Sequence, residues 1–218
     1  MKAYFNIVLF LFIAFAATAQ QPKKFEEKSD PEAKKILKKL ADSYDTKGGI
    51  YIEYKLTMEF GKQKEVQSGN IYQQGDKYYI DNNGNLIICD GKSVWMYNKK
   101  QNEVQINDFD PDGEEILSPA KILNIHEADD EYFYAITGED SKGYKIEFKP
   151  LDEESEIMKI RIEVDKAQQK LKSAKVFSDD GSRYTFEVET MKNQKASSSK
   201  FKFDKAQYPG VTVIDLRE

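Results

Sequence analysis

Histidine and cysteine, which often supply general bases, nucleophiles and metal ligands, each occur only once in this chain of 218 residues. His126 has no second histidine beside which it could bind a metal. We expect His126 to lie at the surface or at a helix end and not to serve in a catalytic triad. Cys89 lies within an apolar run, which favours a buried free thiol. A single cysteine also excludes an intrachain disulfide framework and a multi-cysteine zinc site.

Acidic residues form the other patterns that could do chemistry. The run Asp108-x-Asp110-x-Asp112-Gly113 matches the first half of a calcium-binding EF-hand loop, but Pro119 stands where the bidentate glutamate should be. The carboxylate pairs that a glycosidase would need lie in polar, turn-like stretches, at Glu114/Glu115, Asp129/Asp130 and Asp152/Glu153/Glu154. Solvated loops explain both patterns better. We therefore expect no enzyme activity, no metal ion and no cofactor.

The composition is that of an acidic, folded chain. Its 33 Lys and Arg against 38 Asp and Glu give a net charge of -5, which does not favour nucleic acid as a partner. The 13 Phe and 13 Tyr exclude a disordered acidic chain. One basic stretch, Lys34, Lys35, Lys38 and Lys39, is interpreted as a solvated helix face, with a docking or membrane-surface role as the alternative.

The N-terminus has the features of a targeting segment. Lys2 precedes an apolar run over Ile7–Ala17, which is too short to span a bilayer, and Ala17-Thr18-Ala19 has the small residues of a cleavage site. We expect residues 1–19 to be a signal peptide cleaved after Ala19, which predicts export to the periplasm. No cysteine follows the site, so lipidation is not expected there. Residues 20–29 are expected to be a flexible lead-in and residues 30–218 a single domain.

Two helical segments are predicted. Asp30 as N-cap and Pro31 at the first helical position begin one that ends at Gly48-Gly49. Its apolar side is formed by Ala33, Ile36, Leu37, Leu40 and Tyr44. A second, helical insertion is predicted over 114–126, with Ser118 capping and Pro119 at the first helical position.

The rest of the chain alternates between apolar and polar residues, which is typical of strands with one buried face. The longest such stretch is Ile50–Phe60, and short strands follow up to Asn107 and again from Asp130 to the C-terminus, closing with Phe201, Phe203, Val211 and Val213. About ten antiparallel strands in one sheet are expected. A large sheet curls, and only two helical segments are available to cover its apolar face. The aromatic residues of the strands fit either a filled core or a ligand cavity between sheet and helices.

A resemblance to a known family rests on an ordered set of motifs. Cys89-Asp90-Gly91-Lys92-Ser93-Val94-Trp95-Met96-Tyr97-Asn98 resembles a signature of the LolA family, the periplasmic carriers of outer-membrane lipoproteins. The closing segment, Phe201-x-Phe203 and then Gly210-Val211-Thr212-Val213-x-Asp215-x-Arg217, is similar to the end of that family. Gly69-x-Ile71-Tyr72 and Ser118-Pro119 fall at matching places, so the resemblance extends over nearly all of the mature chain.

The resemblance implies a mainly β fold with an α-helical lid. In this fold an open, unclosed antiparallel half-barrel is covered by the N-terminal helix and the central helical insertion. It implies a monomeric periplasmic carrier that receives acylated lipoproteins from an inner-membrane LolCDE-type transporter and shields their acyl chains. It further implies delivery to an outer-membrane acceptor that is LolB-like or of another kind. The alternative is a periplasmic lipid-sensing or protein-interaction domain on the same scaffold. A glycan-binding or glycan-cleaving protein is a third possibility.

Candidate cavity residues follow from the alternation of the first strand and from the lid. They are Ile52, Tyr54, Leu56, Met58, Tyr79, Trp95, Leu117, Ile122 and Leu123. Tyr79 matches a family position near the cavity mouth, and the alternation leaves either face of the sheet open for Trp95. Many members of the family have an arginine that latches the lid, and the matching position here is Gly75, so the resemblance assigns no latch residue.

Overall fold

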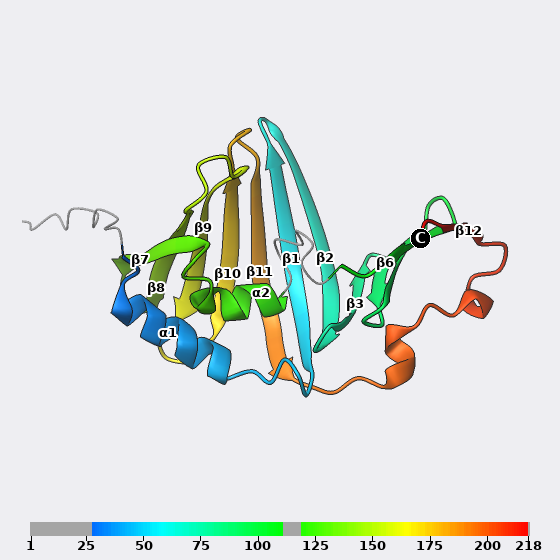
Figure 1. The fold of residues 1–218 in the computed structure, drawn as a ribbon, viewed down its shortest axis with the longest axis horizontal. Helices are drawn as coiled ribbons and strands as arrows, with labels where there is room; N and C mark the ends of the chain where they lie inside the picture. Colours follow the sequence, from blue (N-terminus) through cyan, green and yellow to red (C-terminus); the bar gives the residue numbers. More distant parts are fainter. Residues whose placement is uncertain (1–27, 111–118, 218) are drawn as a thin grey trace, which may run out of the picture.

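A computed structural model describes residues 28–110 and 119–217 of the chain. Twelve strands form one unclosed sheet in the order β12-β6-β5-β4-β3-β2-β1-β11-β10-β9-β8-β7 (Figure 1). The first six strands are β1 (Ile50–Phe60), β2 (Gln63–Gln74), β3 (Lys77–Asn82), β4 (Asn85–Cys89), β5 (Ser93–Asn98) and β6 (Glu103–Asp108). The others are β7 (Tyr132–Glu139), β8 (Gly143–Pro150), β9 (Ile157–Asp165), β10 (Leu171–Ser178), β11 (Arg183–Asn193) and β12 (Thr212–Asp215). The predicted open half-barrel is confirmed, with two more strands than the sequence indicated.

Strand β1 stands at the centre of the sheet. It pairs with β2 over its whole length and with β11 on its other side, and the neighbouring strands of the described sheet are antiparallel with one exception. The exception is β12, which runs parallel to β6. The alternation predicted for Ile50–Phe60 is confirmed in the first half of the strand, where Ile50, Ile52 and Tyr54 are buried and the residues between them are half-exposed.

The N-terminal helix α1 spans Pro31–Asp42, and it begins as predicted. The Asp30 carboxylate accepts a 2.9 Å hydrogen bond from the backbone N–H of Glu32, which satisfies one of the free donors of the first turn. Ala33, Ile36, Leu37 and Leu40 are buried. The predicted end at Gly48-Gly49 is wrong: the helix stops at Asp42, and the residues up to Gly49 form turns.

The helices lie over one face of the sheet, which we call the inner face; the opposite face is the outer face. Figure 1 shows α1 and the short helix α2 (Pro119–Asn124) on the same side of the strands. Helix α2 begins at the predicted Pro119 and continues into the 3-10 turn η1 (Ile125–Glu127). Ile122, Leu123 and Ile125 join the buried side of α1 and the inner face of β1 and β7–β11 in the main hydrophobic core. The helical lid over the sheet is therefore confirmed.

The C-terminal segment covers the outer face of the other half of the sheet. It contains the 3-10 turns η2 (Ser198–Phe201) and η3 (Lys205–Gln207), where the sequence predicted strands through Phe201 and Phe203. That prediction is wrong, because Phe203 and Tyr208 stack on each other and pack with Tyr97 in a second core instead of pairing in the sheet. Two aromatic residues at spacing two match a strand, but here they anchor a segment that crosses the sheet.

Strand β10 was not among the strands predicted from the sequence. Its register with β9 shifts between Leu171 and Ser173, so its buried residues are Leu171, Ala174 and Val176 and the period of two is broken. Alanine also contributes little to a strand signal. The predicted signal peptide and most of the lead-in lie outside the described residues. Within residues 28–110 and 119–217, the structure contains no helix that is long and apolar enough to cross a membrane.

Candidate functional site

The inner face carries an apolar row that crosses five strands. Ile52, Ile71, Ile80, Ile87 and Met96 are cross-strand partners in sequence from β1 to β5. Ile52 and Ile71 are buried, Ile80 and Ile87 are half-buried, and the side chain of Met96 is 46% exposed. Because α1, α2 and η1 share their core with β1 and β7–β11, the row is covered at one end and becomes open toward β5.

A second apolar row lies on the other side of β1. Leu56 pairs with Phe186 of β11, and the row continues through Ala174, Ile162 and Ile146. Phe186 stacks on Tyr54 with ring centroids 4.8 Å apart, and both are buried. Leu56 is half-buried against this core. The residues of this row are packed together up to Leu56 on β1, where the inner face begins to open toward β2–β5.

The far end of β1 leaves further apolar side chains accessible on the inner face. Met58 is half-buried and pairs with Tyr184 of β11. Phe60 meets the edge of the Tyr184 ring at 5.8 Å and is 42% exposed. Exposed aromatic and methionine side chains beside a packed core are a common feature of sites for apolar ligands, because they are large and adaptable.

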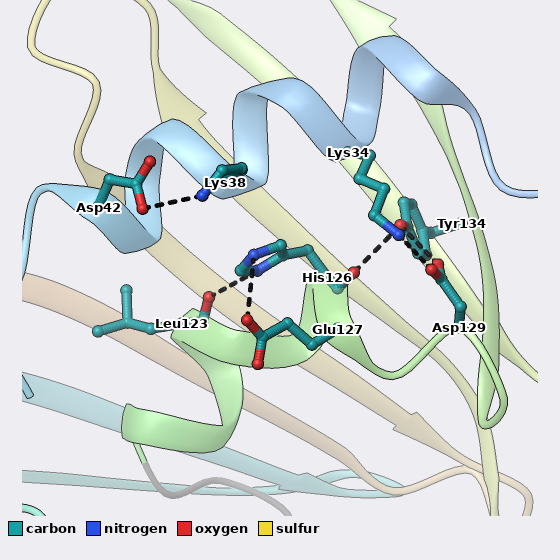
Figure 2. A network of polar contacts seen from close by, with 8 residues as sticks. All are labelled: Lys34, Lys38, Asp42, Leu123, His126, Glu127, Asp129 and Tyr134. Atoms are coloured by element: carbon teal, nitrogen blue, oxygen red, sulfur yellow. Dashed lines mark hydrogen bonds and ion pairs between the residues drawn. The ribbon is translucent and has the colours of Figure 1, made fainter.

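Polar contacts fasten the helical cover to the sheet (Figure 2). The Tyr134 hydroxyl of β7 donates a hydrogen bond to Asp129, at 2.8 Å, and its oxygen also lies 3.3 Å from the backbone carbonyl of His126. Asp129 also forms an ion pair with Lys34 of α1. The hydrogen bond from Lys34 is the main reason why the pKa of Asp129 is lowered, whereas burial, reinforced by Asp129, raises the pKa of Tyr134. The contacts therefore favour an ionised Asp129 and a neutral Tyr134.

His126 is buried at the end of η1. Its Nδ1 lies 3.2 Å from the backbone carbonyl of Leu123, and its Nε2 lies 4.0 Å from the Glu127 carboxylate. The sequence predicted a helix-end or surface position; the position at a helix end is confirmed and the surface position is wrong, because only 5% of the residue is exposed. These contacts hold the turn between α2 and β7, which is a structural role.

A cavity of about 760 Å³ opens beside this turn, between η1 and the loop before β9. Its apolar lining includes four isoleucines, namely Ile122, Ile125, Ile157 and Ile160. Its other side is acidic, with Glu127, Asp130, Glu131, Asp152, Glu154 and Glu156. Ile122 and Ile160 also belong to the main core, so the cavity reaches the edge of the covered part of the inner face.

Tyr79 and Trp95 lie on the outer face, apart from the other candidates. Tyr72, Tyr79, Ile88 and Trp95 are cross-strand partners one position out of phase with the inner row. Both candidates pack against the second core under the C-terminal segment, where the Lys200 ammonium lies 3.8 Å from the centroid of the Tyr79 ring. Burial, with a smaller effect of Asp81, raises the pKa of Tyr79 to about 12. The sheet therefore separates these two residues from the inner face.

The remaining candidates gather on the inner face. Ile52, Tyr54, Leu56 and Met58 line β1, while Ile122 and Leu123 close the core from α2. Leu117 lies outside the described residues. Sequence reasoning missed Phe60, Ile71, Ile80, Ile87 and Met96. In β4 every residue from Leu86 to Cys89 is apolar, so alternation could not tell which face each side chain takes. Only the register of the strands from β1 to β4 shows which of these side chains lie on the inner face.

Metal ligands do not gather in the described parts of the chain. Asp108 ends β6, whereas Asp112 and Gly113 of the EF-hand-like run lie outside the described residues. Within the described ranges, no three or more His, Cys, Asp and Glu side chains are placed so that they could hold a metal ion. Gly75, which stands where the family arginine was expected, has φ +58° in the turn between β2 and β3. This conformation favours glycine.

Known proteins similar to this chain were found at the level of family, sequence and fold. Residues 55–204 match the family described as "Outer membrane lipoprotein carrier protein LolA". An uncharacterized protein of Methanocaldococcus jannaschii is 27% identical over 172 residues, which cover 73% of this chain and 47% of the relative. The chain thus spans about half the length of that relative.

Two solved structures are similar to this chain to different degrees. An uncharacterized conserved protein from Thermus thermophilus has a TM-score of 0.55 at 11% identity, covering 84% of this chain and 99% of its own. A LolA superfamily protein from Nitrosomonas europaea has a TM-score of 0.42 at 11% identity, covering 79% and 98%. The Thermus structure shows that the fold occurs elsewhere with very little sequence in common.

Proposed function

This chain belongs to the LolA family, and from that premise we propose that it is a periplasmic carrier of lipoproteins. It binds the acyl chains of lipoproteins released from the inner membrane and delivers them to the outer membrane. An inner-membrane transporter of the LolCDE type supplies the cargo, and an outer-membrane acceptor takes it. The carrier role requires a surface for hydrocarbon and no covalent chemistry.

The observation that carries the proposal is the partly uncovered apolar inner face. Ile80, Ile87 and Met96 continue the core row beyond the helices, and Leu56 and Met58 border it. Covering an acyl chain contributes about 0.8 kcal/mol for each CH₂ group removed from water, so an exposed lipoprotein would not remain free in water. The inner face offers an apolar surface of the kind that an acyl chain requires. The helices cover the part of this face formed by β1 and β7–β11.

The cover would have to move for cargo to reach the deeper part of the inner face. Helix α1 is joined to the segment after η1 by the pair between Lys34 and Asp129, and Tyr134 joins that segment to the sheet. We propose that these contacts hold the cover in place of the missing family arginine. An ion pair exposed at both partners is weak, so it can be exchanged for cargo contacts at low cost.

Adjacent residues of β1 provide a matched test of this function. Leu56 lies on the inner face, and Lys55 lies on the outer face beside Glu187. Leu56→Glu places a charge among the hydrocarbon contacts, so binding of a fluorescent fatty acid should fall more than about tenfold. Lys55→Glu adds a carboxylate at the neighbouring position and should leave binding unchanged. Circular dichroism checks that both variants fold.

The cargo itself is identified by native mass spectrometry of the mature protein. We expect acylated lipoproteins to co-purify with the wild-type chain and with Lys55→Glu, and to be lost from Leu56→Glu. A folded wild-type chain that stays empty when offered detergent-solubilised lipoprotein would contradict the carrier function. Unchanged fatty-acid binding by Leu56→Glu would contradict the assignment of the inner face. In the first case, the lipid-sensing or protein-interaction alternative should be tested next.

A further inference from the structure

The outer face of the sheet carries a basic patch at the end where β1 turns into β2. Four cations surround the ring of Phe177 in β10. The Lys159 and Lys175 ammonium groups lie 4.9 Å and 5.4 Å from the ring centroid, and the guanidinium carbons of Arg161 and Arg183 lie 5.5 Å and 5.9 Å from it. Like charges gathered around one ring repel one another, so such a cluster is unfavourable unless anions compensate it.

Two carboxylates compensate part of this charge. Glu147 of β8 is 7% exposed and accepts hydrogen bonds from Arg161, at 2.5 Å and 2.8 Å, and from Lys159, at 3.2 Å. Glu59 of β1 lies 3.5 Å from Lys175 and is the cross-strand partner of Arg183. These pairs fix the basic side chains on the outer face without neutralising all of them.

The patch extends along two cross-strand rows. Lys64 of β2 is the partner of Glu59, and Lys149 follows Glu147 on the same face of β8; both are exposed. The rows contain Lys64, Lys149, Lys159, Arg161, Lys175 and Arg183 against Glu59 and Glu147, which gives 6 − 2 = +4. Counting Asp179 and Asp180 of the following turn leaves 6 − 4 = +2, although the whole chain has a net charge of -5.

The next row on the same face is electrically balanced. Lys55 lies 3.6 Å from Glu187, and Lys145 lies 4.0 Å from Glu163. The excess of positive charge in the patch is thus not continued in the next row. The inner face at this same end carries Met58, Phe60 and Tyr184, the accessible apolar residues described above. A basic outer face and an open apolar inner face therefore meet at one end of the sheet.

We propose that the basic patch docks this protein on an anionic lipid bilayer. The patch is spread across β2, β1, β11, β10, β9 and β8, about 25 Å of sheet at a strand spacing of about 4.8 Å. A spread of long basic side chains matches a plane of phosphate groups better than a single small anion. Val66, on the same face and 48% exposed, adds an apolar contact. The inference rests on the proposed function for its purpose, which is to hold this end of the sheet, where the open inner face begins, at the membrane that contains the cargo.

The test is co-sedimentation of the cargo-free, full mature protein with lipid vesicles. We expect binding to vesicles of phosphatidylglycerol mixed with phosphatidylcholine, loss of binding at high salt, and none to pure phosphatidylcholine. Each basic residue near such a surface contributes about fivefold in affinity. Lys149→Gln combined with Arg183→Gln should therefore weaken binding about 25-fold. Both side chains lie on the exposed surface, and circular dichroism checks the fold.

Matched control variants separate the patch from general charge. Lys55→Gln with Lys145→Gln removes two positive charges from the balanced row and should weaken binding less than the patch variant does, because each of these lysines is already paired with a glutamate. Lys35→Gln with Lys39→Gln does the same on α1. Equal losses in all three double variants would overturn the assignment, as would wild-type binding to anionic vesicles no tighter than to neutral ones; an acidic protein partner would then be sought. Fatty-acid binding measured in parallel, without vesicles, shows whether the proposed function stands by itself.

Discussion

The hydroxyl of Tyr134 in β7 donates a 2.8 Å hydrogen bond to Asp129, and this contact joins the sheet to the helical cover (Figure 2). Asp129 in turn pairs with Lys34 on α1. Tyr134 and Asp129 are only five positions apart in sequence, yet together they link a strand of the sheet to the N-terminal helix. The ring of Tyr134 is fully buried and tilted against Phe148 at 5.0 Å, so its hydroxyl is held in place by the core.

Tyr134→Phe should loosen the cover while leaving the core packed. The variant keeps the ring but removes one hydrogen bond to a charged group, so the free energy of unfolding should fall by about 1–3 kcal/mol. Hydrogen exchange should become faster in α1 and η1 than in β1. Lys38→Gln is the control, because the ion pair that Lys38 forms in the described part of the chain, with Asp42 at 3.2 Å, lies within α1. Equal exchange rates in wild type and Tyr134→Phe would show that the hydroxyl does not hold the cover.

Glu147 should make stability depend on acid pH. Burial favours its neutral form, but hydrogen bonds from Arg161 and Lys159 outweigh that effect and lower its pKa from 4.5. Because the folded pKa lies below the unfolded one, the ionised Glu147 contributes fully above pH 4.5, and its contribution disappears as the pH falls through the lowered folded pKa.

Glu147→Gln should therefore destabilise the chain by about 1–3 kcal/mol near neutral pH and by less in acid. Urea unfolding of both proteins across this pH range measures the difference. Glu163→Gln removes a carboxylate from the balanced outer row, where its pair with Lys145 is exposed, and should cost less than about 1 kcal/mol. A wild-type–variant difference that stays constant down to strongly acid pH would contradict the role given to the Glu147 carboxylate.

Trp95, the single tryptophan, should not touch bound cargo. It lies half-buried on the outer face, and its neighbour Met96 is exposed on the inner face. A brominated fatty acid quenches indole fluorescence only at short range, so it should leave wild-type fluorescence nearly unchanged. Met96→Trp in a Trp95→Phe background should be quenched strongly at the same ligand concentration. Strong quenching of Trp95 itself would place cargo on the outer face.

Cys89 should be an inert thiol in the folded protein. It is fully buried at the end of β4, and its sulfur accepts a 3.3 Å hydrogen bond from the backbone N–H of Gly91. Reaction with a disulfide reagent should therefore follow the urea unfolding curve, because the thiol becomes accessible only on opening. Fast, complete labelling in buffer alone would mean that β4 opens readily.

Elements with local signals could be predicted from the sequence. The Asp30-Pro31 start of α1 and the long strand Ile50–Phe60 are confirmed because capping and alternation depend on neighbours in the chain. Helix α2 begins at the predicted Pro119, while its predicted cap, Ser118, lies outside the described residues. The buried Cys89 follows from the same kind of signal, an apolar run. Motifs in their order along the chain also indicated the family.

Beyond β1, the face that each strand residue occupies follows from the pairing of the strands and not from the sequence pattern. Trp95 and Met96 are neighbours in an apolar stretch, and a shift of one residue in register would exchange their faces. A register shift also broke the period of β10, and packing with Tyr97 and Tyr208 placed Phe203 in a crossing segment instead of a strand. The basic patch is distributed over β2, β1 and β8–β11, which are far apart in sequence, so its charge becomes visible only when the strands lie side by side. Long-range pairing, which a local pattern cannot specify, thus decides both faces of this sheet.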